Sequence, residues 1–272
     1  MAAATLVAAF ASCDPASAQD SGSSTAAEQQ KVAKDLSNPV ADMASIPLQF
    51  NWESGVGDPQ DLRLILNIQP VVPFSLNSNW VLVGRFIMPY MNQPAGLMGE
   101  TASGTGDIIA SAFFTPKRSP VVCGFGPVFG LPTTTNPLLG SGKWMMGPTA
   151  VVLKQKGPLS IGFLGNHLWS ISDTGDIERK DVSQTFLQPF LTFTTRTAWT
   201  FGINTESTYD WKAPDGEEWT VPIHAWVSKV TRMGPFPFSV ALGGGYFVES
   251  PDMGADWKLR TAFTLILPKG KS

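Results

Sequence analysis

The sequence predicts an all-β fold: a single closed, antiparallel, up-and-down transmembrane β-barrel of about 12 strands, with a short N-terminal helix in front of it. Three observations predict this fold. The strand candidates are long, the connections between them alternate between tight and extended, and tryptophans fall close to strand ends. These features are typical of barrels whose outer face contacts lipid and whose interior is wet.

The composition narrows the class of protein. Charged residues make up 15% of the 272 residues, against the usual quarter or so, and the chain has 26 glycines and 22 prolines. A net charge of −3 gives no sign of a nucleic-acid partner. The mean hydropathy of +0.04 is too low for a bundle of membrane helices, but it fits a barrel in which polar and apolar faces alternate. The two long charge-free runs, 64–84 and 119–142, contain prolines and polar amides, so neither predicts a transmembrane helix.

The N-terminal region divides into two parts before the barrel domain of residues 46–272. Residues 1–18 resemble the end of a secretory signal peptide, since an apolar run is followed by the small-x-small site Ala16-Ser17-Ala18; the basic start of such a peptide is missing. Residues 19–45 predict a polar lead and a short helix over Thr25–Leu36, where Thr25 and Glu28 have capping-box spacing. Three positions are open for this segment: it lies in the periplasm, it plugs the lumen, or it contacts a partner.

Twelve strand candidates follow. Most have 9 to 15 residues, which is enough to cross a bilayer when tilted, whereas strands of soluble proteins cluster near five or six. They cover residues 46–54, 61–74, 79–91, 105–116, 120–132, 143–155, 158–171, 182–195, 198–211, 217–231, 236–249 and 257–268.

The connections alternate in length along the chain. The tight ones are residues 75–78, 117–119, 156–157, 196–197 and 233–235, and the longer ones are 55–60, 92–104, 133–142, 172–181, 212–216 and 250–256. Outer-membrane barrels have tight periplasmic turns and longer extracellular loops. An even number of strands also places both termini at the periplasmic end.

The strand over residues 198–211 separates polar from apolar side chains at period two. Trp199, Phe201 and Ile203 share one face, and Asn204 and Glu206 lie on the other. Charged side chains within spans cannot face lipid, because a midplane arginine costs about 2–4 kcal/mol. We therefore expect polar side chains to line the lumen, where they either form ion pairs with one another or contact the solute directly. They are Gln49, Asn51, Glu53, Arg63, Asn67, Gln69, Arg85, Gln188, Asn204, Glu206 and Arg260.

Eight tryptophans fall near the ends of the expected strands. Indole rings favour the headgroup level of a membrane, so this placement predicts two aromatic girdles. The residues are Trp52, Trp80, Trp144, Trp169, Trp199, Trp211, Trp219 and Trp257.

No catalytic or metal site is expected. Asn166-His167 with Ser170 is the best candidate for catalysis, but neighbouring residues of a strand point to opposite faces, so Asn166 cannot orient His167. A structural or interfacial role is expected for the two histidines, His167 and His224. No His, Cys, Asp and Glu residues cluster at ligand spacing, and Cys123 is left as an apolar filler with no disulfide partner after cleavage. We expect no enzyme activity, no cofactor and no metal.

Several segments also resemble a known family. LSNPVADMASIPLQFNWESGVG, LNIQPVVPFSL, GDIIASAFFTPK, GPVFGLPTTTNPLLGSGKW, GPTAVVLKQKGP, FLQPF and NTESTYDW are similar to bacterial outer-membrane transporters of the phenol-degradation MetA-pathway type, some of which carry the misapplied name neuromedin U. The resemblance covers Leu36–Lys269. It implies an outer-membrane β-barrel, and it supplies no functional motif that can be carried over residue by residue.

These observations lead to one expected function and two alternatives. We expect a passive channel or transporter for small polar or aromatic solutes in a Gram-negative outer membrane, in contact with the lipid bilayer and lipopolysaccharide. The first alternative is a closed structural or surface-interaction barrel that acts through its extracellular loops, chiefly residues 92–104. The second is a soluble lipocalin-like binding barrel. The sequence carries no signal for an oligomeric state.

Overall fold

The computed structural model describes residues 15–57, 60–95, 99–175, 179–234 and 236–267. The expected signal peptide lies outside these residues except for its last four, which belong to the helix α1 (Pro15–Leu36). The helix expected over Thr25–Leu36 is present. It begins earlier in the chain, with a proline at its first position, where the missing N–H has no helical partner to lose. The expected polar lead is therefore helical.

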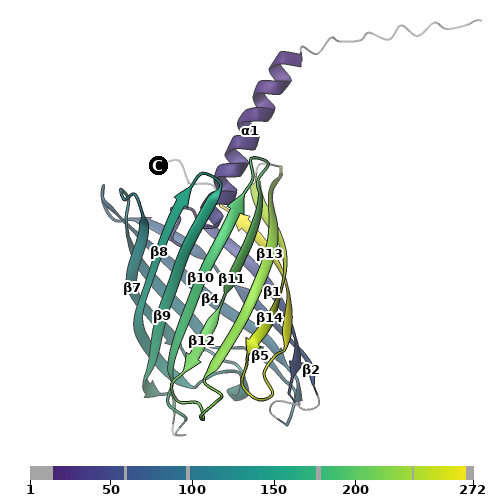
Figure 1. The fold of residues 1–272 in the computed structure, drawn as a ribbon. Helices are drawn as coiled ribbons and strands as arrows, with labels where there is room; N and C mark the ends of the chain where they lie inside the picture. Colours follow the sequence, from purple (N-terminus) through teal and green to yellow (C-terminus); the bar gives the residue numbers. More distant parts are fainter. Residues whose placement is uncertain (1–14, 58–59, 96–98, 176–178, 235, 268–272) are drawn as a thin grey trace, which may run out of the picture.

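The rest of the chain forms one closed antiparallel barrel of 12 strand positions, as predicted (Figure 1). The strands are β1 (Ser45–Val56), β2 (Asp61–Ile68), β3 (Val71–Ser75), β4 (Trp80–Gln93), β5 (Ala102–Thr105), β6 (Ile108–Pro116), β7 (Val122–Leu131), β8 (Lys143–Lys156), β9 (Leu159–Asp173), β10 (Ser183–Thr194), β11 (Trp199–Thr205), β12 (Ser207–Asp210), β13 (Trp219–Met233), β14 (Phe236–Glu249) and β15 (Trp257–Ile266). A short 3-10 helix, η1 (Pro137–Leu139), lies between β7 and β8.

Three positions of the barrel wall hold two short strands in place of one. These are β2 with β3, β5 with β6, and β11 with β12. Pro70 separates β2 from β3, because proline has no N–H to give to the ladder. Glu206 separates β11 from β12, and its side chain is engaged in the interior. The ring closes where β1 pairs with β15, from Ser45 opposite Ile266 to Ser54 opposite Trp257.

Large apolar side chains cover the outside of the barrel. In β11, Phe201 is 52% exposed while its neighbour Thr200 is 1% exposed, and in β15 Phe263 is 48% exposed. A soluble protein would bury such side chains in its core. Because they face outward along strand after strand, the soluble lipocalin-like alternative is wrong, and the barrel has the inverted polarity of a membrane protein.

The tryptophans expected in girdles are exposed, apart from the half-buried Trp52. Trp80 and Trp199 begin strands at the end with tight turns, and the other six lie toward the end with long loops. The girdles themselves stay a prediction. The ninth tryptophan, Trp226, lies in the middle of β13 and lines the interior.

The helix α1 stands at the tight-turn end, where the last strand also finishes, so both ends of the described chain lie on this side (Figure 1). Among the described residues, no helix is both long and apolar enough to span a membrane. Near its C-terminal end, Ala33 packs against Ala198 and Val230 of the wall. We call residues 33–43 the plug, because they enter the barrel mouth and line the space inside it.

The outward position of Phe201 gives a test of the membrane-facing surface. We expect Phe201→Arg to lower the free energy of unfolding by about 1–2 kcal/mol, because it places a charge in the apolar band two residues from the strand end at Trp199, where the cost is smaller than the roughly 2–4 kcal/mol of the midplane. Denaturant titration of the barrel refolded in phospholipid vesicles measures this change. Phe201→Leu is the matched control and should leave the stability nearly unchanged; equal stability of the arginine variant would contradict the inverted polarity.

Candidate functional site

A cavity of about 290 Å³ lies inside the barrel, between the plug and the middle of the wall. We call it the chamber. The plug forms one side of it through Leu36, Pro39 and Met43. The wall contributes inward-facing residues from strands on either side of the β1–β15 seam, where every second side chain points to the interior. The volume is at the small end of the range of roughly 300–1,000 Å³ for small-molecule sites.

The most heavily charged part of the wall is centred on Glu206. Arg260 donates from Nη1 and Nη2 to the two carboxylate oxygens of Glu206, each at 2.7 Å, and Lys258 Nζ lies 3.1 Å from Oε2. Arg260 Nε also donates to Asn51 Oδ1 at 2.6 Å. A bidentate arginine–carboxylate pair of this kind is strong and fixes orientation. We call these four residues the central ion cluster.

A second ion pair lies nearby on the same side of the wall. Arg63 Nη2 is 2.6 Å from Glu53 Oε2, and Arg63 Nε donates to the same oxygen at 2.8 Å. Glu53 is buried, so its charge requires this partner.

A chain of amides connects Arg85 to the wall. Arg85 Nη2 donates to Gln69 Oε1 at 3.3 Å, and Gln69 Nε2 donates to Gln49 Oε1 at 3.1 Å. Asn67 Nδ2 donates to the same oxygen of Gln49 at 3.4 Å. Each amide therefore holds the next in one orientation, and the guanidinium of Arg85 is directed into the chamber.

The eleven polar residues expected in the lumen come together in this region. The chamber itself is lined by Gln49, Gln69, Arg85, Gln188, Asn204, Glu206 and Arg260. Of the other four, Asn51 and Asn67 hydrogen-bond to chamber residues, and Glu53 and Arg63 pair with each other. Whether any of them contacts a solute stays a prediction.

Trp226 and the buried His224 also line the chamber, although neither was expected there from the sequence. His224 Nδ1 lies 3.3 Å from Asn204 Oδ1. Trp226 lies close against Gly202, where an added Cβ would come within 2.3 Å of the indole Cε2. Glycine here leaves room for the ring to lie along the wall. The period-two alternation of β13, in which His224 and Trp226 share a face, is the signal that would have found both.

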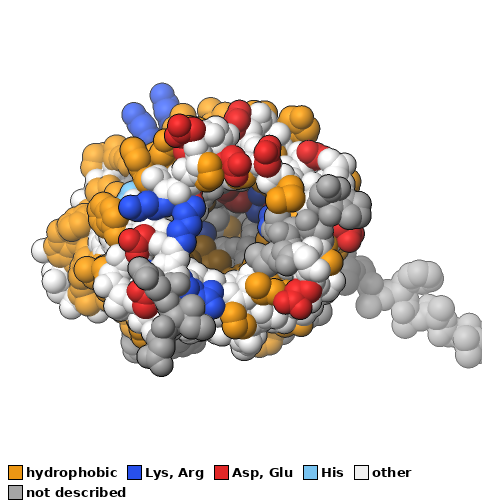
Figure 2. Space-filling view, turned by 90° about the horizontal axis from the view of Figure 1, so that it is seen from below, with side chains coloured by type: hydrophobic (Ala, Val, Ile, Leu, Met, Phe, Trp, Pro, Cys, Tyr) orange, Lys and Arg blue, Asp and Glu red, His pale blue; other side chains and the backbone are white. Residues whose placement is uncertain are grey.

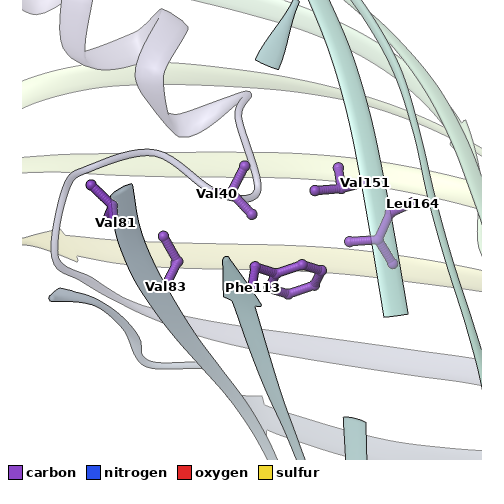
Figure 3. Close-up of a cluster of buried hydrophobic side chains, with 6 residues drawn as sticks. All are labelled: Val40, Val81, Val83, Phe113, Val151 and Leu164. Atoms are coloured by element: carbon purple, nitrogen blue, oxygen red, sulfur yellow. The ribbon is translucent and has the colours of Figure 1, made fainter. Parts of the chain in front are cut away.

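The lumen is not polar throughout, in contrast to the expectation. Val81 and Val83 of β4, Phe113 of β6, and Val151 and Leu164 of β8 and β9 point inward and are buried, and Val40 of the plug packs among them (Figure 3). One part of the interior is therefore apolar, and the plug shields it from water. The barrel interior is amphipathic.

The candidate catalytic residues do not come together. His167 Nδ1 lies 2.7 Å from Thr185 Oγ1, and its ring lies 4.1 Å from that of the exposed Trp169, on the outer face. Ser170 hydrogen-bonds to Asp181 at 3.3 Å. Among the described residues, no three potential metal ligands group together.

The long-loop end has a hollowed mouth with charged side chains around its rim (Figure 2). At the start of β8, Lys143 Nζ lies 2.7 Å from Asp173 and 3.0 Å from Asp181. The hydrogen bond from Lys143 holds the pKa of the Asp181 carboxyl below its usual value. These contacts tie the connection after β9 to the rim.

No family model matches the chain, and no curated protein matches it. Among solved structures, it is similar to the COG4313 outer membrane channel from Pseudomonas putida F1, with a TM-score of 0.66, 14% identity and coverage of 83% of this chain and 96% of that chain. Weaker likenesses are the CymD monoaromatic hydrocarbon channel (TM-score 0.44, 9% identity, 88% and 92% covered) and a Pseudomonas aeruginosa FadL homologue (0.39, 8%, 85% and 92%).

The closed barrel, its apolar exterior and its polar interior cluster define the class of this protein, which is an outer-membrane β-barrel. Within this class, its fold is that of the COG4313 channel. At 14% identity the likeness concerns the fold alone.

The central ion cluster gives a test of the interior electrostatics. We expect Glu206→Gln to lower the free energy of unfolding by about 3 kcal/mol, because it leaves Arg260 and Lys258 without their counter-charge in a partly buried site. Urea titration in detergent micelles measures this. Glu249→Gln, at an exposed position at the end of β14, is the matched control. A loss no larger than that of the control would show that the cluster contributes no net stability.

Proposed function

We propose that this protein is a passive outer-membrane channel for small solutes, closed at its periplasmic end by its own N-terminal segment. The observation that carries the proposal is the chamber, a cavity of about 290 Å³ inside the barrel that ends at the plug. A barrel that served only as a membrane anchor would have no need for a lined cavity in its interior. Passage requires that the plug leave the mouth.

The contacts of the plug support a reversible closure. Val40 is its main apolar anchor, and burial of a valine side chain is worth about 1.5–3 kcal/mol. Gln155 Nε2 donates to Lys34 O of the plug at 3.1 Å, and Arg232 Nη1 lies 3.1 Å from Glu28, farther up α1, in an exposed ion pair. Exposed pairs contribute little. Asp35 and Asp42 of the plug take part in further interactions. Displacement of the plug would expose Val40 and Ala33 to water, and a solute that fills this apolar space would offset part of that cost.

The proposed solute has both a polar and an apolar part. The chamber and the central ion cluster offer hydrogen bonds and charge, while Val81, Val83 and Phe113 offer an apolar surface once Val40 has moved. The resemblance to phenol-degradation transporters supports a small and partly apolar solute. The similarity in fold to the COG4313 outer membrane channel supports a channel but says nothing of the solute. Lipopolysaccharide would surround the rim of long loops on the outer leaflet.

The plug also keeps one alternative open, a closed barrel that acts through its loops. Conductance in planar lipid bilayers separates the two functions. We expect Val40→Asp to raise the open-channel conductance several-fold, because a carboxylate in an apolar cluster expels the plug. Ala27→Asp adds the same charge at an exposed position of α1 and should behave as the unaltered chain does.

A second variant covers the case in which the plug adapts to the single substitution and stays in the barrel mouth. A chain without residues 20–43 removes the plug and keeps Ala44, whose carbonyl accepts a hydrogen bond from Leu267 N at 3.0 Å. Proteoliposome swelling with small sugars and amino acids measures its permeability. If neither variant conducts more than the unaltered chain, the channel proposal fails and the closed-barrel alternative is favoured.

A further inference from the structure

The charges of the barrel interior do not balance. The wall around the chamber carries four cationic side chains among the described residues, Arg63, Arg85, Lys258 and Arg260, and two carboxylates, Glu53 and Glu206, while the plug adds a third carboxylate, Asp35. Glu53 forms an ion pair with Arg63, and Glu206 forms ion pairs with both Arg260 and Lys258. Arg85 forms no ion pair with a described carboxylate, and its partner is the neutral amide oxygen of Gln69.

The surroundings of Arg85 hold its guanidinium in place without neutralising it. The amide chain through Gln69 and Gln49 fixes one N–H of Arg85, at 3.3 Å from Gln69 Oε1. A guanidinium has five N–H donors in a rigid planar fork, which matches the two oxygens of a carboxylate. The fork of Arg85 lines the chamber, so its other donors face a space that a solute enters.

The same chamber offers an apolar surface within reach of a small molecule. Trp226 and Phe190 line it together with Val71, Ala241 and Ala262. Asp35 lines the plug side of the chamber and takes part in interactions of its own. The negative charge of Glu206 is already met by two cations. The uncompensated charge facing the chamber from the wall is therefore positive.

We infer that Arg85 is the binding site for the anionic group of the solute, and that the solute is a small organic anion with an apolar body, such as an arene carboxylate. The carboxylate accepts two hydrogen bonds from Arg85, and the ring lies beside Trp226 and Phe190. This inference rests on the proposed function, since it names the class of solute that the channel admits. It assigns this role to Arg85 and not to Arg63 or Arg260, because those two arginines are already paired with carboxylates.

Binding of benzoate and of benzamide to the full chain in detergent tests the inference. The two molecules have the same shape and differ in charge, and isothermal titration calorimetry measures both affinities. We expect benzoate to bind about ten-fold more tightly than benzamide, as charge-assisted hydrogen bonds are stronger than neutral ones. In the Arg85→Gln variant, the affinity for benzoate should fall to that for benzamide, and the affinity for benzamide should stay unchanged.

Arg118→Gln removes the same charge from an exposed turn and should keep the preference for benzoate. Heat-modifiable migration of each variant on a gel confirms that the barrel is folded. Equal affinities in the unaltered chain, or an unchanged preference in Arg85→Gln, overturn the inference. Binding and transport are measured separately, so the two proposals can fail separately. A protein that conducts but shows no preference for benzoate contradicts only the anion site. A protein that prefers benzoate but does not conduct contradicts only the channel.

Discussion

Every strand that crosses a bilayer must find partners for its N–H and C=O groups among other strands, because hydrocarbon offers none. In this chain the requirement is met by the pairing of β15 with β1, which closes the ring. Closure then decides where side chains go. Phe201 and Phe263 face the lipid, and the charges of Glu206 and Arg260 are confined to the interior. The chamber exists because polar residues have only that side to occupy.

Sequence periodicity determines the wall but not the contents of the lumen. The lengths of strands and connections were sufficient to predict twelve positions, and mid-strand charges such as Arg85 had only one face available to them. Val81, Val83 and Phe113 were not recognised as interior residues, because an apolar residue facing lipid and one facing a plug look alike in a strand. Their partner, Val40, lies outside the barrel domain in sequence. Pro70 divides a strand that the pattern alone describes as continuous.

The plug and the wall match each other in polarity. The valine-rich part of the lumen receives Val40, and the small side chains Ala198 and Val230 receive Ala33. Water is thereby kept from the apolar part, while the polar part holds the chamber. A solute with one charged and one apolar end, as proposed above, would find both environments inside the barrel. The helix α1 thus contributes to the shape of the site as well as to its closure.

The hydrogen bond from Arg260 to Asn51 joins the final strand to the first, and Arg260 also carries the bidentate contact to Glu206. Glu206 lies between β11 and β12, so the cluster connects three parts of the wall that are distant in sequence. Separation of β1 from β15 would break the Arg260–Asn51 hydrogen bond in addition to the backbone ladder between the two strands. The side chains of the interior thus reinforce the seam at which the ring closes.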